Sequence, residues 1–174
     1  DPDLFIICSP STKHYDNFRV IEKFFNKKIV LIEKPLFNRY INIKKKFNNK
    51  YFVGYNLRFH PALIYIKKYL KKKSIFSIRV NTSSYLPHWR KKKNYTESVS
   101  ANSKLGGGVL MEISHELDFV TWIFGKINLL YAYNNKISKL KVDVDDILNL
   151  TGTIKKNIFV KMNLNFFSRV NSRE

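Results

Sequence analysis

The stretch that most constrains this chain is a short apolar run, residues 29–32, which stops abruptly at Glu33-Lys34-Pro35. Four large aliphatic residues without polar alternation are typical of a strand buried on both faces, as in the parallel sheets of α/β proteins. Pro35 has no N–H to give to a strand ladder and favours an extended backbone at Lys34. We therefore expect a carboxylate and an ammonium group at the carboxyl end of this strand, the edge at which open α/β sheets bind ligands.

The run lies within a strand–helix–strand pattern. Residues 4–8 form another unbroken apolar run, and the turn at residues 9–12 carries hydroxyl groups that can cap a helix. Apolar residues at helical spacing predict a helix through about residue 25, and a further strand is expected at residues 51–55. A right-handed crossover would place the turn at residues 9–12 beside Glu33-Lys34-Pro35.

The hydrophobic period changes after about residue 74. Residues 76–83 alternate between apolar and polar side chains, as in a strand with one solvent-exposed face. Helical spacing predicts an amphipathic helix at residues 62–72. It also predicts a helix that is opened by the glycine-rich break at residues 105–108 and runs through about residue 124. Alternation also predicts three closing strands, the last two joined by a hairpin turn at residues 155–157: residues 129–133, 147–154 and 158–166. These patterns support an α/β half followed by a mostly antiparallel α+β half.

The composition is dominated by positive charge, with a formal net charge of +19 over 174 residues. Such a charge suggests nucleic acid or an anionic membrane as a partner. The lysines, however, are spread along the chain and interleaved with Asn, Ile, Phe and Tyr, which favours a solvated surface over one basic patch. The single cysteine, Cys8, excludes an internal disulfide framework, and no membrane span or signal peptide is visible. We expect a cytoplasmic protein with no specific nucleic-acid partner and no membrane partner.

Lys34 is the strongest candidate for a catalytic residue. A lysine beside a carboxylate in a partly dry crevice can hold a substrate hydroxyl or pass a proton. Burial would lower its pKa and Glu33 would raise it, so the sequence leaves the balance open. The competing interpretation is a surface ion pair after a strand, which would be the commoner case for Glu-Lys-Pro alone.

His115 and Glu112 form a second candidate pair, because three-residue spacing puts them on one face of the expected helix. A histidine there can take a hydroxyl proton when a sugar alcohol is oxidised, or return it on reduction. A purely structural pair is the competing interpretation, and in isolation it is narrowly favoured. The chain shows no clear further ligand set, so we predict no metal site.

Trp89, Tyr95 and the segment Asn56-Leu57-Arg58-Phe59-His60 can line a pocket, since an indole suits sugar faces and a guanidinium suits phosphate oxygens. Ordinary loop packing explains these residues about equally well. The three consecutive glycines at residues 106–108 indicate only a tight turn or a close backbone approach. No Gly-x-Gly-x-x-Gly dinucleotide fingerprint occurs in the chain.

Several motifs follow one another in a recognisable order: Ser-Pro-Ser-x-x-His at residues 9–14, Glu-Lys-Pro at 33–35, and the stretches 54–61, 86–101 and 106–118. Together they resemble the Gfo/Idh/MocA family of NAD(P)-dependent sugar oxidoreductases over nearly all 174 residues. The stretch that contains His115 is similar to a branch associated with surface-polysaccharide sugars.

The resemblance implies two domains. Residues 1–57 would be the C-terminal part of a Rossmann dinucleotide-binding domain. Residues 58–174 would be part of an α+β domain for substrate binding and oligomerisation, with an open, mostly antiparallel sheet and helices on one face. It further implies hydride transfer between NAD or NADP and a hydroxyl or keto carbon of a sugar or nucleotide sugar, in polysaccharide biosynthesis. A homo-oligomer that assembles through the C-terminal sheet is expected.

The resemblance also assigns roles to single residues. The implied catalytic residues are Lys34, His115 and Glu112. The implied cofactor-binding residues are Ser9, Pro10, Ser11, His14, Glu33, Lys34 and Asn56. The implied substrate-binding residues are Lys34, Arg58, Trp89 and His115.

The chain departs from the family pattern in two ways. It begins at the family's fourth strand, so the Gly-rich phosphate loop and the ribose-binding acidic residue are absent, and it stops after the strand that ends near residue 166. We expect a fragment of a longer enzyme that is inactive alone. The family commonly has Asp four residues before the histidine, where this chain has Met111, and Glu112 would then be the acidic partner.

Two other classes of function stay open. A basic nucleic-acid-binding module should carry its cations on one face with aromatic stacking positions, whereas the expected strands expose Ser, Thr and Asn beside their lysines. A sensor or structural protein can keep the fold without the chemistry. Lys34 and His115, both present, argue against such a non-catalytic protein.

Overall fold

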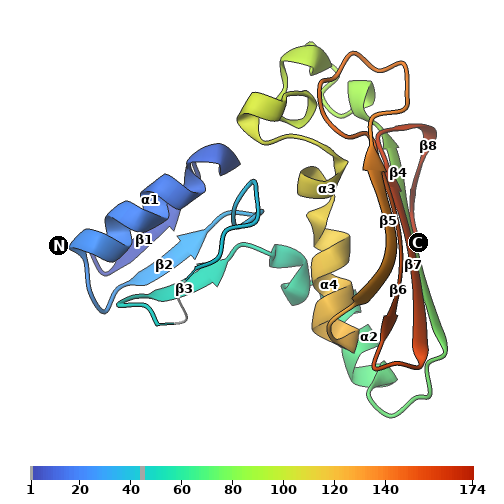
Figure 1. Ribbon diagram of the computed structural model, residues 1–174, viewed down its shortest axis with the longest axis horizontal. Helices are drawn as coiled ribbons and strands as arrows, with labels where there is room; N and C mark the ends of the chain where they lie inside the picture. The colour runs from blue at the N-terminus through green and yellow to red at the C-terminus, as the bar shows by residue number, and fades with distance from the viewer. Residues whose placement is uncertain (1, 44–45) are drawn as a thin grey trace.

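The computed structural model describes residues 2–43 and 46–174 and contains two separate β-sheets (Figure 1). The strands of the first sheet are β1 (Leu4–Ile7), β2 (Ile29–Ile32) and β3 (Lys50–Val53). The strands of the second are β4 (Ser77–Tyr85), β5 (Asn128–Asn135), β6 (Ile147–Ile154), β7 (Ile158–Asn165) and β8 (Phe167–Arg173). The α-helices are α1 (Ser11–Phe24), α2 (Pro61–Leu70), α3 (Val109–Glu112) and α4 (Ser114–Phe124).

The first sheet has the order β1-β2-β3, and both neighbouring pairs are parallel, as predicted. Helix α1 connects β1 to β2 and packs on one face of the sheet. Its Phe18 and Ile21 are buried together with Ile7 of β1 and with Val30 and Ile32 of β2. Because parallel strands run in one direction, their carboxyl ends share one edge, which Figure 1 shows directed toward α3 and α4.

Two predictions about this sheet are wrong. The apolar runs are not buried on both faces, since Leu4, Ile6 and Ile29 are about half exposed. Only α1 covers the sheet among the residues described, so alternate side chains of each strand remain open to solvent. The expected hydroxyl cap of α1 is also missing: the N-cap residue is Pro10, which makes no side-chain bond, and Ser9 Oγ instead accepts a hydrogen bond from Asn17 Nδ2 at 2.9 Å.

The second sheet has the order β5-β6-β7-β4-β8. Strands β4 and β7 pair in parallel, and the other three neighbouring pairs are antiparallel, which confirms the predicted mostly antiparallel sheet. The hairpin between β6 and β7 is also confirmed. Lys155 and Lys156 adopt φ values of 51° and 66°, the left-handed backbone that short hairpin turns require.

The prediction that the last strand ends near residue 166 is wrong, because β8 follows at once and pairs antiparallel with β4. Its sequence, Phe-Ser-Arg-Val-Asn-Ser-Arg, has little apolar alternation, and Val170 is 74% exposed. This edge strand joins the sheet by backbone pairing and by polar side chains such as Ser172, which bonds Ser83. The hydrophobic pattern therefore carries no signal for it.

The helix predicted to follow the glycine-rich break at residues 105–108 and to run through about residue 124 is divided into two helices. Helix α3 ends at Glu112 and α4 begins at Ser114, because Ile113 leaves the helical region with φ −100° and ψ 27°. Apolar side chains of both helices nevertheless pack against the sheet: Val109, Ile113 and Val120 are buried in its core. Helices α2, α3 and α4 lie on one face of the five-stranded sheet (Figure 1).

A buried carboxylate joins α4 to two strands of this sheet. Glu116 is fully buried. Its Oε1 accepts a hydrogen bond from Thr82 Oγ1 on β4 at 3.1 Å and forms an ion pair with Arg173 Nε on β8 at 2.9 Å. A buried carboxylate that loses its cation keeps the cost of its own desolvation. The pair with Arg173 therefore stabilises the attachment of the edge strand β8.

We predict that Arg173→Met lowers the free energy of unfolding by about 1–3 kcal/mol, because it leaves the Glu116 carboxylate buried with one partner fewer. Thermal unfolding followed by circular dichroism measures the effect, and Arg39→Met, at an exposed arginine, is the control. The double variant Glu116→Gln/Arg173→Met should lose less than the sum of the two single variants. Additive losses would show that the two side chains are not coupled.

Candidate active site

Glu33 and Lys34 stand at the carboxyl end of β2, where the sequence places them. The Lys34 side chain reaches across to α3, and its Nζ donates a hydrogen bond to the backbone oxygen of Glu112 at 3.2 Å. Glu112 is the last residue of α3, so its carbonyl lies where the helix breaks. This bond joins the tip of β2 in the first sheet to the helix pair that covers the second sheet.

His115 lies in the first turn of α4, just beyond that break. Its ring packs edge-on against Tyr55, with 5.7 Å between the ring centroids, and its Nδ1 atom is buried without a hydrogen-bond partner. Burial lowers the pKa of His115, and the positive charges of Lys34 and Arg173 lower it further, against smaller opposing effects of Asp118 and Glu33. The imidazole is therefore neutral near neutral pH, the form that accepts a proton.

The predicted pairing of Glu112 with His115 is not formed. Glu112 Oε2 accepts a hydrogen bond from Ser100 Oγ at 3.1 Å, and the His115 ring makes no hydrogen bond within residues 2–43 and 46–174. The break at Ile113 is the reason, because the two residues no longer sit on one continuous helix. Glu112 contributes its backbone oxygen to Lys34 rather than its carboxylate to His115.

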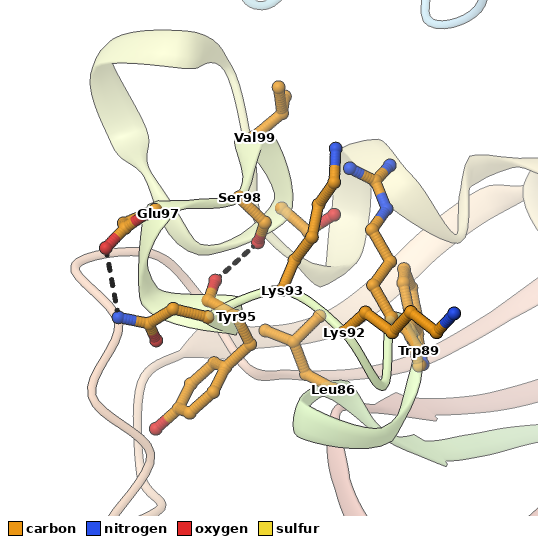
Figure 2. A pocket seen from close by; sticks show the side chains of 11 residues that line it. Leu86, Trp89, Lys92, Lys93, Tyr95, Glu97, Ser98 and Val99 are labelled. Atoms are coloured by element: carbon orange, nitrogen blue, oxygen red, sulfur yellow. Dashed lines mark hydrogen bonds between the residues drawn. The ribbon is translucent and has the colours of Figure 1, made fainter.

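Trp89 is held in place on the far side of Glu112. Its Nε1 donates to Ser84 Oγ at 2.9 Å, its ring packs edge-on against the buried Phe166 at 5.1 Å, and 41% of the residue stays exposed. Trp89 and Glu112 both line one cavity of about 380 Å³. Trp89 also lines a second cavity, drawn in Figure 2. The Trp89 indole therefore forms part of the wall of both cavities. The smaller cavity also contains Glu112, whose backbone oxygen accepts the hydrogen bond from Lys34.

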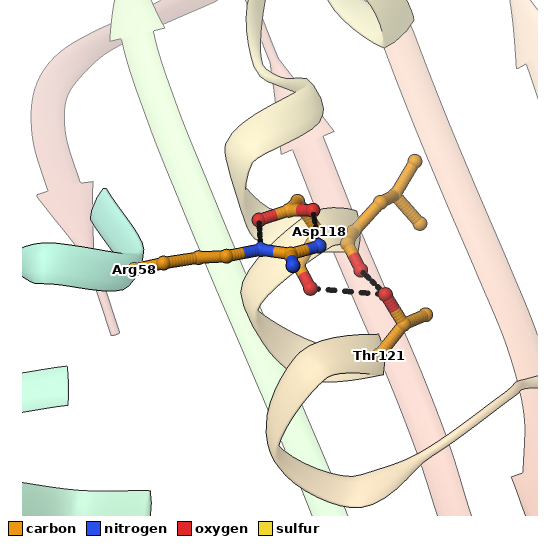
Figure 3. A network of polar contacts seen from close by, with 4 residues as sticks. Arg58, Asp118 and Thr121 are labelled. Carbon is orange, nitrogen blue, oxygen red and sulfur yellow. Dashed lines mark hydrogen bonds and ion pairs between the residues drawn. The ribbon is translucent and has the colours of Figure 1, made fainter. Parts of the chain in front are cut away.

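Arg58 is committed to an ion pair with Asp118 (Figure 3). It lies in a short 3-10 helix, Asn56–Phe59, and its Nε donates to Asp118 Oδ2 at 2.8 Å while Nη2 donates to Oδ1. Thr121 Oγ1 donates to the backbone oxygen of Asp118 at 2.9 Å. The guanidinium predicted to bind substrate therefore holds the chain between β3 and α2 against α4.

Apart from Lys34, described above, the predicted cofactor-binding residues divide into two groups. Pro10, Glu33 and Asn56 are exposed, and Ser9 is half-buried, just beyond the carboxyl ends of the three parallel strands. His14 and Ser11 are buried, so neither side chain is open to a ligand. The structure places the first group, but not the second, at the open edge of the sheet.

His14 binds the backbone of two strand tips instead. Its Nε2 lies 2.8 Å from the oxygen of Ser9, and its Nδ1 lies 2.9 Å from that of Pro35 and 3.2 Å from that of Leu36. Ser11 Oγ points to the oxygen of Gly106 at 3.5 Å. These two side chains fix the turns after β1 and β2, so they position the edge rather than line it.

Three side chains near the site are not among the residues predicted from the sequence. Tyr55, directly after β3, packs on His115, and burial raises the pKa of its hydroxyl. Glu116 and Arg173 approach the site from α4 and β8. A tyrosine next to the Asn56 segment was a usable signal for Tyr55. Arg173 had none, since its strand was not predicted.

No group of three or more His, Cys, Asp and Glu side chains in the described ranges is arranged to hold a metal ion. Over the same ranges, no helix is both long enough and apolar enough to cross a membrane.

Sequence comparison identifies the family. The model of the oxidoreductase family, C-terminal alpha/beta domain (Gfo/Idh/MocA), matches residues 67–172. The chain belongs to the Gfo/Idh/MocA family. A comparison with curated proteins finds no significant match. The family resemblance of the motifs and the predicted fold class are thereby confirmed.

Solved structures share the fold. A levoglucosan dehydrogenase in complex with NADH is 22% identical with a TM-score of 0.82, over 99% of this chain and 50% of that one. The WlbA dehydrogenase from Chromobacterium violaceum, in complex with NADH and UDP-GlcNAcA, is 19% identical with a TM-score of 0.76, over 98% and 51%. A myo-inositol dehydrogenase from Corynebacterium glutamicum is 16% identical with a TM-score of 0.68, over 99% and 53%. The chain thus spans about half the length of these Gfo/Idh/MocA structures.

The pKa of His115 provides a direct test of the site geometry. We predict that Lys34→Met raises this pKa toward the ordinary value of 6.5, because one of the positive charges that disfavour the imidazolium is removed. NMR titration of the four histidine ring signals measures the change. Lys71→Met, which removes an exposed lysine at the end of α2, is the control and should leave His115 unchanged. An unaltered His115 pKa in Lys34→Met would place the two groups too far apart to cooperate.

The same shift has a consequence for stability. Because the folded chain binds this proton less readily than the unfolded chain, the contribution of His115 to stability is complete above pH 6.5. It is lost as the pH falls through the lowered pKa of the folded state.

Proposed function

We propose that the full-length protein is an oxidoreductase that transfers a hydride between a nicotinamide cofactor and a hydroxyl or keto carbon of a sugar or nucleotide sugar. The observation that carries this proposal is the bond from Lys34 Nζ to the oxygen of Glu112, which sets a strand-tip ammonium next to the helix that presents His115. Oxidation of an alcohol needs a group that holds the hydroxyl oxygen and a neutral group that accepts its proton. It also needs a binding site for the cofactor that accepts the hydride, and the open sheet edge can provide that site. Family membership agrees with this chemistry.

In the proposed reaction Lys34 and His115 handle the proton. Lys34 donates a hydrogen bond to the oxygen of the reacting carbon and holds it in place. During oxidation His115, neutral because its pKa is lowered, takes the hydroxyl proton, and during reduction the imidazolium returns it. The bound nicotinamide accepts or supplies the hydride. Tyr55 packs on the His115 ring and keeps it oriented.

The residues at the sheet edge fit the nicotinamide end of NAD or NADP. The carboxyl ends of three parallel strands meet there, which is where such sheets bind ligands. Ser9, Pro10, Glu33 and Asn56 would hold this group, with His14 and Ser11 fixing the turns behind them. Solved relatives that contain NADH have the same fold, which supports the proposal.

We assign residues 1–57 to the dinucleotide-binding domain and residues 58–174 to the substrate domain. The last strand of the three-stranded sheet ends at Val53. The next strand along the chain, β4, begins at Ser77 and belongs to the second sheet. Polysaccharide biosynthesis is the proposed process, supported by the WlbA structure, whose ligand is UDP-GlcNAcA.

We predict that Lys34→Met lowers turnover in the full-length protein by roughly 100-fold or more, because general acid–base groups contribute at least that much. Cofactor affinity should change far less, since the side chain acts at the reacting carbon. Steady-state kinetics with NAD and NADP, together with a direct cofactor titration, separates the two effects. Lys71→Met is the matched control, and turnover in Lys34→Met equal to that control would refute the assignment.

A homo-oligomer through the second sheet is also proposed. Tyr131 and Tyr133 of β5 pair with Thr151 and Asn149 of β6, on the face opposite the helices, and Tyr131 is 59% exposed. Exposed aromatic groups on an open sheet are typical of a protein interface.

We predict that Tyr131→Lys shifts the full-length protein toward the monomer, because the charge would be buried in this interface. Light scattering after size-exclusion chromatography measures the mass. Tyr40→Lys, at an exposed tyrosine of the first domain, is the control. A wild-type monomer, or an oligomer that survives Tyr131→Lys intact, would contradict the proposed interface.

A further inference from the structure

A second cavity, of about 550 Å³, lies in the loop between β4 and α3 (Figure 2). Its size is typical of a small-molecule site. Three cationic side chains line it, Arg90, Lys92 and Lys93, against one carboxylate, Glu97. The proposed reaction at Lys34 and His115 makes no use of this cavity.

Among the residues that the structure describes, no carboxylate forms an ion pair with any of the three cations. Glu97 Oε1 accepts a hydrogen bond from Asn94 Nδ2 at 3.1 Å, as Figure 2 shows. Within residues 2–43 and 46–174, no ion pair joins Glu97 to Arg90, Lys92 or Lys93. The cavity therefore keeps an excess of positive charge, which an anionic ligand would neutralise.

The walls of the cavity are held firmly, although its cations are exposed. Leu86 is buried at its base, and Trp89 is fixed by its bond to Ser84 and by Phe166. Tyr95 is fixed at both ends: its hydroxyl accepts from the Lys141 N–H at 3.1 Å, and its backbone oxygen accepts from Ser98 Oγ at 2.6 Å. A fixed aromatic wall beside free cations suits a ligand with a flat or apolar part and an anionic part.

The cavity is connected to the proposed reaction site by direct contacts. Ser100 lines the cavity and donates its Oγ hydrogen bond to Glu112 Oε2, and the backbone oxygen of Glu112 accepts from Lys34 Nζ. Trp89 lines both this cavity and the smaller one that contains Glu112. The cavity therefore lies close to the Lys34 contact, with Ser100 and Glu112 between them.

We infer that this basic cavity binds the phosphate or diphosphate group of an anionic sugar substrate, while the reacting carbon of the sugar lies at Lys34 and His115. The inference rests on the proposed function for the identity of the sugar, but the anion site itself can be measured without any redox reaction. Arg90 offers a planar fork for phosphate oxygens, and Lys92 and Lys93 add point charges. The substrate class is thereby narrowed to phosphorylated or nucleotide-linked sugars.

The test uses Trp89 as its own reporter. Residues 1–174 contain two tryptophans, so Trp122→Phe leaves Trp89 as their only indole, and any tryptophan elsewhere in the full-length protein is replaced by Phe in the same background. Pyrophosphate, uridine diphosphate and uridine are titrated into this variant of the full-length protein at physiological salt, with fluorescence as the readout. We expect pyrophosphate and uridine diphosphate to change the Trp89 signal with saturation, and uridine to have little effect. Tighter binding of uridine diphosphate than of pyrophosphate would indicate a nucleotide sugar, and equal binding a simple sugar phosphate.

Two triple variants separate a site from general attraction to a basic protein. Arg90→Ala/Lys92→Ala/Lys93→Ala removes the three cations of the cavity, and Lys71→Ala/Lys72→Ala/Lys73→Ala removes the same charge from an exposed run after α2. We expect the first to weaken pyrophosphate binding about tenfold or more, and the second by less than roughly twofold. Equal losses, or no saturable binding by the wild type, would overturn the inference.

Failure of the anion site and failure of the proposed function are distinguishable. Saturable binding that depends on Arg90, Lys92 and Lys93 supports the site even where the protein transfers no hydride. Hydride transfer to neutral sugars without any pyrophosphate binding would overturn the anion site and leave the oxidoreductase proposal intact.

Discussion

The hydrogen bond from Lys34 to the oxygen of Glu112 is the contact on which the candidate site depends. The last carbonyl groups of a helix have no partner within the helix. The break at Ile113 creates such an end in the middle of what would otherwise be one continuous helix, and the ammonium group lies at this negative end. The same break starts a new helix one residue before His115. One local irregularity thus holds the lysine and presents the histidine.

Charges around the site are arranged so that the histidine stays neutral. Lys34 and Arg173 both oppose a proton on His115, in addition to its burial. Asp118 would favour the proton, but its carboxylate is engaged by the Arg58 fork. The structural ion pair and the proposed chemistry are therefore linked, because Arg58 is paired with the anion that acts to raise the pKa of His115.

The sequence predicts the framework of the fold better than the details of the site. Unbroken apolar runs and alternating runs are sufficient to locate most of the strands, although among the described residues the first sheet is covered on one face only. The start of α3, by contrast, is set by the distant Asp145, whose Oδ2 accepts from the Leu110 N–H at 2.9 Å. Gly108, with φ of 108°, is needed because a Cβ there would lie 2.2 Å from Asp145 Oδ1. The three glycines at residues 106–108 predict that another part of the chain comes close to this backbone. No local sequence pattern identifies that part as Asp145.

The same difference between a local sequence pattern and its contacts in the fold explains why two of the predicted cofactor-binding residues, Ser11 and His14, are buried. The motif Ser-Pro-Ser-x-x-His marks the right edge of the sheet, but its histidine is 1% exposed and lies against the backbone oxygens of Ser9 and Pro35. Those oxygens belong to the turns after β1 and β2, and the second turn directly follows Lys34. A side chain that spans both turns fixes the distance between the proposed cofactor edge and the lysine. A motif residue can thus be required by the site without touching a ligand, and only its burial and its partners distinguish the two roles.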